Sequence, residues 1–108
     1  MKIFAGALAV LGLAMAAHEA SARSVLERRG NVLAARLCAP CHAIGKTGAS
    51  RHADAPPFRH LDLRVNFDEF ALRLRQGFMT GVHEMPVLRF SRNDARALVA
   101  YLRAIQSQ

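Results

Sequence analysis

The C-terminal part of the chain carries the clearest helical pattern, over residues 91–105. Its apolar positions recur every three or four residues and share one face: Ala95, Leu98, Val99, Leu102 and Ile105. Three arginines lie outside this apolar face and are free to face solvent: Arg92, Arg96 and Arg103. Ser91 followed by Asp94 is typical of a capping box, in which the serine side chain binds a free backbone N–H. The pattern predicts an amphipathic helix that starts after Ser91.

A second helix is predicted over residues 66–76. Asn66 suits its N-cap, Glu69 follows three residues later, and Gly77 suits its end. The apolar residues at helical spacing are most simply interpreted as core residues: Phe67, Phe70, Ala71 and Leu74.

A third helix is predicted over residues 24–37, where Leu26, Leu33 and Leu37 lie close to one face with Gly30. Glycine inside a helix costs about 1 kcal/mol relative to alanine, so Gly30 invites a packing explanation. We expect another helix to cross closely there, with Tyr101 beside the crossing.

The rest of the chain gives no strand pattern. Leu61, Leu63 and Val65 alternate, but they are too few for a sheet. Residues 43–64, rich in glycine and proline, and residues 78–90 are predicted to be irregular. The fold class is therefore all-α.

Residues 1–22 have the organisation of a secretory signal peptide. Lys2 precedes an uncharged apolar run from Ile3 to Ala17, and Ala20-Ser21-Ala22 is a small-x-small cleavage site. The run is shorter than the about 20 residues that span a bilayer, so we expect cleavage and no stable membrane insertion afterwards. An uncleaved anchor is the alternative. Residues 23–108 then form the mature domain, too small to bury a large core without help from a metal, a cofactor or disulfides.

The chain of 108 residues has a formal charge of +7, which cleavage does not change because it removes both Lys2 and Glu19. The bases are mostly arginine and are spread through the chain. No nucleic-acid motif accompanies them, so we interpret them as a basic surface that attracts an acidic partner and not as a nucleic-acid site.

The only two cysteines of the chain lie in Cys38-Ala39-Pro40-Cys41-His42. C-x-x-C-H is the attachment pattern of c-type haem: two thiols add to the two vinyl groups, and the histidine binds the iron axially. A zinc site would need two further ligands, and His52, His60 and His83 lack finger spacing. A thioredoxin-like motif would need a βαβ unit. A chance match to the short pattern is the remaining alternative.

Three residues are candidates for the second axial ligand: Met79, His83 and Met85. Met85 is favoured because Pro86 restricts the backbone beside it. A thioether ligand raises the reduction potential, whereas a second histidine lowers it. The carbonyl of Pro56 or Pro57 has no local helical partner and is a candidate acceptor for the outer N–H of His42. The alternative is a pair of turn prolines without such a role.

Together, these features resemble the small monohaem cytochromes c of the mitochondrial and bacterial type. The resemblance spans Val25 to Ile105 and is carried by several features: Gly30 eight residues before Cys38, the Cys38–His42 motif, Ala55-Pro56-Pro57-Phe58, a histidine shortly before Met85-Pro86, and Tyr101-Leu102. It implies three main helices around one covalently bound haem c, with the first and last helices crossing. It also implies that His42 and Met85 are the axial pair and that the carbonyl of Pro56 orients His42.

The function that the resemblance implies is one-electron transfer by an exported, periplasmic protein, not catalysis. Partners would be redox proteins with an acidic docking face. Two alternatives stay open: a haem enzyme subunit or gas-binding sensor with an open axial position, and a small zinc-binding module without haem.

Overall fold

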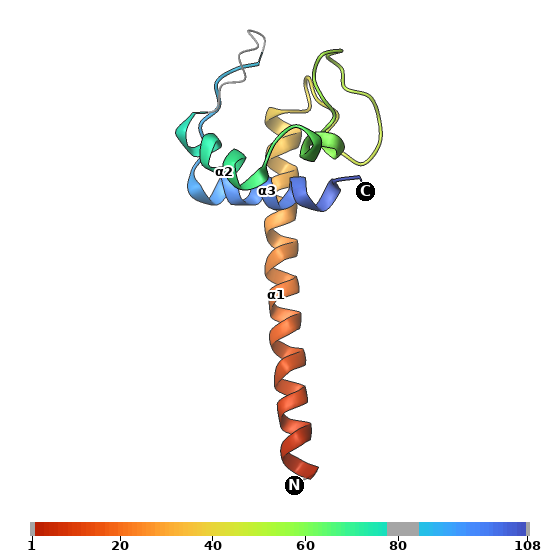
Figure 1. The fold of residues 1–108 in the computed structure, drawn as a ribbon, viewed down its shortest axis with the longest axis vertical. Coiled ribbons are helices and arrows are strands. Elements are labelled where there is room, and N and C mark those ends of the chain that lie inside the picture. Colours follow the sequence, from red (N-terminus) through yellow and green to blue (C-terminus); the bar gives the residue numbers. More distant parts are fainter. Residues whose placement is uncertain (1, 78–84, 108) are drawn as a thin grey trace.

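The computed structural model describes residues 2–77 and 85–107, and all regular elements of these ranges are helices. They are the helix α1 (Lys2–Leu37), a short 3₁₀ helix η1 (Phe58–Leu63), α2 (Phe67–Gln76) and α3 (Arg92–Ile105) (Figure 1). The prediction of an all-α fold is confirmed. Met79 and His83 lie outside the described residues.

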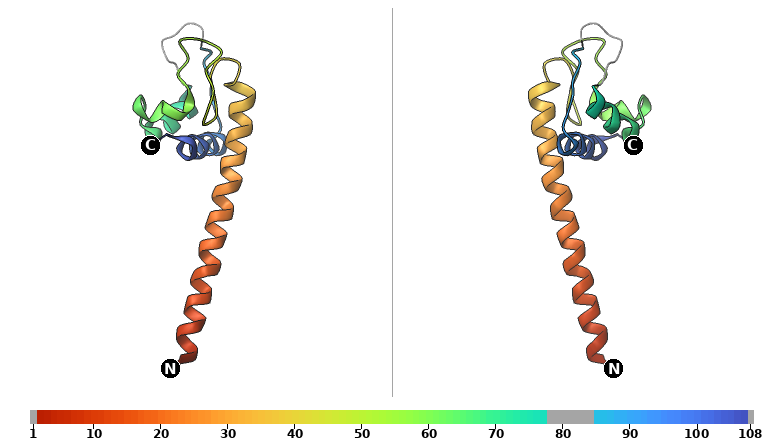
Figure 2. Two further views of the ribbon diagram at one scale, coloured as in Figure 1. Left: turned by 90° about the vertical axis from the view of Figure 1, so that its right-hand side faces the viewer. Right: turned by 90° about the vertical axis from the view of Figure 1, so that its left-hand side faces the viewer.

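Helix α1 is much longer than the helix predicted over residues 24–37. It continues without a break toward the N-terminus and projects from the other helices, so the molecule is 67 Å long (Figures 1 and 2). Every residue from 10 to 23 is exposed, although most are apolar, and partial burial begins at Ser24. The packed part of α1 therefore coincides with the predicted helix, and the projecting part with the predicted signal peptide.

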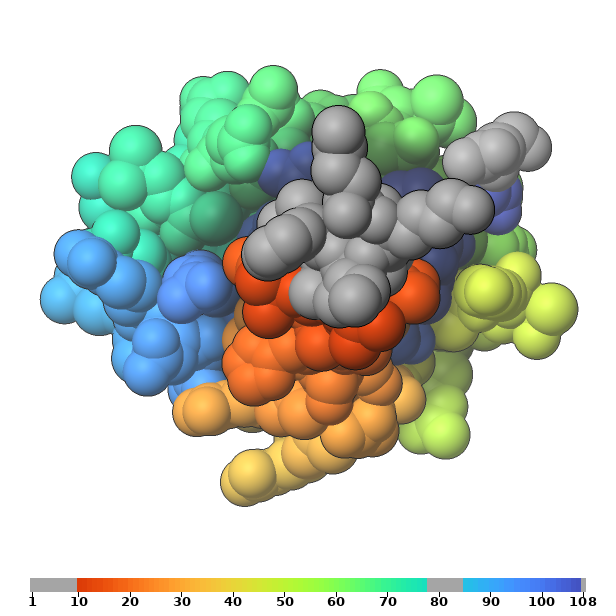
Figure 3. Space-filling view, turned by 90° about the horizontal axis from the view of Figure 1, so that it is seen from below, coloured from red at the N-terminus to blue at the C-terminus, as the bar shows by residue number. Residues whose placement is uncertain are grey.

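Figure 3 looks at the molecule from the N-terminal side of α1, with the other helices behind it. None of the helices in the described ranges combines the length and apolarity that a bilayer span requires.

Helix α3 runs across α1 at Gly30 (Figure 1). A Cβ atom added to Gly30 would overlap the carbonyl oxygen of Ala97 and lie 2.6 Å from the Cβ of Tyr101. Ala97 is itself completely buried, and Arg29 pairs with Asp94 at 2.6 Å beside the crossing. The close crossing predicted from Gly30 and Tyr101 is confirmed, because only a residue without a side chain lets the two backbones approach this closely.

Gly30→Ala is expected to lower the free energy of unfolding by at least about 2 kcal/mol, because overpacking outweighs the gain in helix propensity. In a domain of this size, thermal unfolding would show a fall in Tm of about 10 °C. Gly45→Ala is the matched control, since a Cβ at Gly45 meets nothing within 4 Å. Equal stability of the two variants would show that the helices are not held together at Gly30.

Helices α2 and α3 begin and end where their sequences predict. The Asn66 side chain accepts hydrogen bonds from the backbone N–H groups of Asp68 and Glu69, and Ser91 accepts one from Asp94. Gly77 ends α2 with a positive φ of 97°, which glycine adopts without strain. The whole predicted apolar face of α3 is buried, and its three arginines are exposed.

Residues 43–64 were predicted to be irregular throughout. This is wrong for Phe58–Leu63, which form η1. Phe58 and Leu61 point inward from this element and are buried. The Gln106 side chain donates to the Phe58 carbonyl at 2.7 Å and accepts from the Asp62 N–H at 2.9 Å. A glutamine beyond the end of α3 therefore fixes η1, a long-range contact without a signal in local sequence periodicity.

Tyr101 connects α3 to the loop after α1. Its hydroxyl donates to the Ile44 carbonyl at 2.6 Å, and burial raises the pKa of this hydroxyl above its usual value. The tyrosine therefore stays a neutral donor, and it holds the loop that follows the two cysteines against the core.

Candidate functional site

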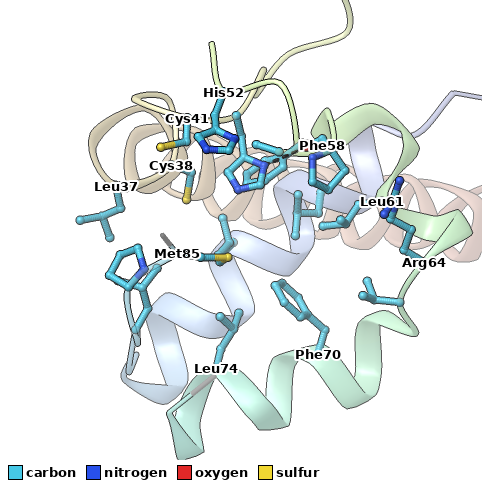
Figure 4. Close-up of a pocket in the computed structure, with 18 of the residues that line it drawn as sticks. Leu37, Cys38, Cys41, His52, Phe58, Leu61, Arg64, Phe70, Leu74 and Met85 are labelled. Carbon is cyan, nitrogen blue, oxygen red and sulfur yellow. Dashed lines mark hydrogen bonds between the residues drawn. The ribbon is translucent and has the colours of Figure 1, made fainter. Parts of the chain in front are cut away.

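A cavity of about 330 Å³ lies between the end of α1, the loop up to η1, helix α2 and the segment before α3 (Figure 4). Its size falls in the range of about 300–1,000 Å³ typical of ligand and cofactor sites. Most of its wall is apolar, and the wall includes side chains from α1, η1, α2, α3 and the loops: Leu37, Cys38, Cys41, His42, His52, Asp54, Ala55, Pro56, Phe58, Leu61, Arg64, Val65, Phe70, Leu74, Met85, Pro86, Leu88, Phe90, Leu98 and Leu102.

The two cysteines lie where α1 ends. The Cys38 N–H donates to the Ala34 carbonyl at 2.9 Å, which continues the helical pattern by one residue. The N–H groups of Cys41 and His42 then both donate to the Cys38 carbonyl, at 3.1 and 2.8 Å. This tight turn brings the side chains of all three residues to the wall of the same cavity.

Both thiols are free, and Cys38 is buried. Burial raises the pKa of the Cys38 thiol to about 11, because the thiolate would lose its hydration. A redox-active C-x-x-C cysteine has the opposite property, a lowered pKa. The environment of Cys38 therefore favours an uncharged sulfur, which a thioether is, over a thiolate.

His42 has a fixed ring orientation. Its Nδ1 lies 2.8 Å from the carbonyl oxygen of Pro56, and because a carbonyl only accepts, Nδ1 carries the proton and donates. The ring also packs against Phe58, with 4.9 Å between the ring centroids. In this tautomer the neutral Nε2 keeps its lone pair, which is the form of histidine that binds a metal.

Pro56 is held in place by a backbone hydrogen bond of the chain that follows it. The Phe58 N–H donates to the Ala43 carbonyl at 2.9 Å, so the segment with Pro56 is tied to the residue directly after His42. Proline has no N–H and cannot continue a helix, which leaves the chain extended here and its carbonyl available to a side chain.

Met85 lines the cavity, and Figure 4 shows its side chain extending into it, below Cys38 in that view. Pro86 lines the same wall. The residues predicted at the site therefore meet at one cavity: Cys38, Cys41, His42, Pro56 and Met85. The two other candidates for the second axial ligand, Met79 and His83, lie outside the described residues.

Several lining residues were not predicted as part of a site. Phe70 and Leu74 were interpreted as core, and they are buried, but they also form one wall of the cavity. Helical periodicity marks the inward face of α2 without showing whether protein or cofactor lies opposite. His52 and Arg64 also line the cavity. His52 was considered only as a zinc ligand, and no motif pointed to Arg64.

The described residues do not offer a site for a metal ion bound by side chains alone. Within residues 2–77 and 85–107, no three histidine, cysteine, aspartate or glutamate side chains gather as ligands. A structural zinc ion takes four ligands, so the zinc interpretation has no ligand set in this part of the chain.

These features fit the group that the C-x-x-C-H motif implies: a mostly apolar cavity, two free thiols in its wall, and a histidine whose Nδ1 proton is fixed by a carbonyl. They define a small all-α haem-attachment domain. Comparison with curated proteins finds cytochrome c-552 of Bradyrhizobium diazoefficiens, 32% identical over 97 residues, which cover 89% of this chain and 90% of that protein. The chain therefore belongs to the cytochrome c family, whose members carry covalently bound haem c and exchange electrons with redox partners.

Two further comparisons give no match. No protein-family model matches the chain, and no solved structure matches it.

Proposed function

We propose that this protein is an exported carrier of single electrons, with one haem c bound through Cys38 and Cys41 and with His42 and Met85 as axial ligands. The observation that supports it most directly is the convergence of these four side chains on one mostly apolar cavity. The haem, when bound, supplies the reversible change between ferric and ferrous iron.

The side chains of the protein hold and tune that group. The Pro56 carbonyl keeps the proton of His42 on Nδ1 and raises the basicity of Nε2. The Met85 thioether, a soft and neutral donor, favours the ferrous state and so raises the potential. His42 and Met85 would together hold the iron on both sides and leave no place for a substrate, so the protein would act as a carrier and not as an enzyme.

Export is part of the same proposal. The apolar residues described between positions 10 and 23 of α1 are exposed, with Val10 68% and Leu13 73% exposed. Such a surface is unfavourable in water but suits a signal peptide that is removed near Ala22, which leaves a periplasmic domain over residues 23–108.

The expected partner is a redox protein with an acidic docking face. The formal charge of +7 attracts such a face over a distance and accelerates encounter, an effect that salt weakens. We therefore expect the bimolecular rate of electron exchange to fall as ionic strength rises.

The experiment that tests the function is a visible spectrum of protein exported from a host that attaches haem, with and without carbon monoxide. We expect a low-spin spectrum that carbon monoxide does not change at neutral pH, and an intact mass of one haem on a chain beginning at Arg23. Carbon monoxide binding to the reduced protein would instead support the sensor or enzyme alternative. A chain that binds zinc and lacks a Soret band would refute the proposal altogether.

A further inference from the structure

Gln106 is the first residue after helix α3, and its side-chain amide makes hydrogen bonds through both its nitrogen and its oxygen. Its Nε2 donates to the carbonyls of Phe58 and Leu102, both at 2.7 Å. Its Oε1 accepts from the Asp62 N–H at 2.9 Å. A reversed amide would place an oxygen against two carbonyls, so these partners fix its orientation. Helix α3 therefore ends beside η1 (Figure 1) and is joined to it by one side chain.

The two elements joined in this way differ in rigidity. A 3₁₀ helix has poorer hydrogen-bond geometry than an α-helix, so η1 depends on its tertiary contacts. One more such contact follows Gln106, because the Ser107 N–H donates to the Arg59 carbonyl at 2.9 Å. Helix α3 is closely packed, since Leu102 is completely buried and the helix crosses α1 at Gly30. Gln106 therefore fixes a short 3₁₀ element to the packed core.

The part of η1 that Gln106 binds lies against His42. Phe58 is buried, and 4.9 Å separate the centroid of its ring from that of the His42 ring. Only Pro57 lies between Phe58 and Pro56, whose carbonyl oxygen is 2.8 Å from the histidine Nδ1. The pyrrolidine ring holds the φ of Pro57 at −64°, which makes this connection stiff. A displacement of Phe58 is therefore transmitted to the Pro56 carbonyl.

We propose that Gln106 is a positioning residue for His42, because its hydrogen bonds to η1 keep the Pro56 carbonyl on Nδ1 of that ring. The inference rests on the proposed function in one respect, namely that His42 binds the haem iron. A carbonyl bonded to Nδ1 raises the basicity of Nε2, and a more basic ligand stabilises ferric over ferrous iron. Gln106 does not line the cavity, so it affects the potential only through η1 and the histidine.

Gln106→Met tests the proposal in the haem-loaded protein, because methionine keeps an unbranched side chain and makes none of the hydrogen bonds of the amide. In NMR spectra of the ferrous protein, the Nδ1 proton of His42 should move upfield as its bond to the carbonyl lengthens. At a fixed potential, the ferrous-to-ferric ratio should rise by at least about twofold, or about 18 mV for a one-electron couple. A loss of stability without a change in the folded geometry would move neither signal.

Gln76→Met is the matched control, since Gln76 is an exposed glutamine at the end of α2 and lines neither cavity. We expect it to leave the proton and the ratio unchanged. Gln106→Glu keeps an oxygen for the Asp62 N–H and removes both N–H donors, so at pH 8 it should also move the His42 proton upfield. Its added charge acts on the ratio as well, so only the proton is compared. It decides the matter if Gln106→Met yields too little protein.

A His42 Nδ1 proton that does not move in Gln106→Met or in Gln106→Glu would overturn the proposal. An unchanged or lower ferrous-to-ferric ratio in Gln106→Met would overturn it too, as would equal shifts in Gln76→Met. All measurements use protein that keeps its haem after denaturation. Absence of covalent haem from the unmodified protein would refute the proposed function instead, so the two failures are distinguishable.

Discussion

Replacing both Cys38 and Cys41 with serine is expected to give a chain that carries no covalently bound haem and lacks a stable tertiary structure. The mostly apolar cavity lies within the packed part of the molecule, residues 24–77 and 85–107, and side chains from every helix of these ranges line it. Without a group to fill it, these side chains lose their main packing partner, and a domain of this size has little other core. We expect the largest change of any substitution in the chain.

Two measurements check this expectation. Haem absorption of the purified protein after denaturation reports covalent attachment, and circular dichroism in the near and far ultraviolet reports tertiary and helical structure. Pro40→Ser is the matched control, because it introduces serine at an exposed free position of the same motif. A doubly substituted chain that keeps haem through denaturation would show that the cysteines are not the attachment points.

The helices that the sequence predicts well are those whose ends have their own chemical signals. In the structure, the side chains of Asn66 and Ser91 accept hydrogen bonds from backbone N–H groups at the start of a helix. Gly77 adopts the left-handed conformation that ends α2. Gly30 is informative for another reason, since a glycine in a helix is costly and the crossing with α3 explains it. Helix capping and the close approach of two helices each depend on one or two residues, so the sequence alone can indicate them.

The extent of α1 and the presence of η1 were not predicted, and the reasons differ. No proline lies between Lys2 and Leu37, and alanine and leucine are frequent there, so nothing stops the helix at the predicted cleavage site. Element η1 depends on Gln106, more than 40 residues away. Local periodicity contains no information about such a contact.

At the site, the sequence predicts the residues that bind through a defined motif, and it does not predict the wall. The spacing of Cys38, Cys41 and His42 follows from the covalent chemistry of haem attachment. Phe70 and Leu74 instead have the same pattern whether a side chain or a cofactor lies opposite. No sequence motif identifies Arg64 as a residue of the cavity wall, because an arginine in a basic chain is most simply interpreted as part of the solvated surface.

Replacing Met85 with alanine is expected to remove the weak far-red band of the ferric spectrum and to lower the reduction potential. A thioether ligand stabilises ferrous iron, so if Met85 is the ligand, its removal would leave the sixth position to water or another weak ligand. The shift should be on the order of 0.1 V or more, within the span of about 0.8 V that axial ligands cover. The ferrous variant should also bind carbon monoxide at neutral pH.

Met79→Ala is the matched control, because it removes the same side chain from the other candidate methionine of the segment. We expect it to keep the far-red band, the potential and the insensitivity to carbon monoxide. The reverse result, with the band lost in Met79→Ala and kept in Met85→Ala, would assign the iron to Met79. If neither variant loses the band, neither methionine is its source, and His83 becomes the candidate that a further substitution must test.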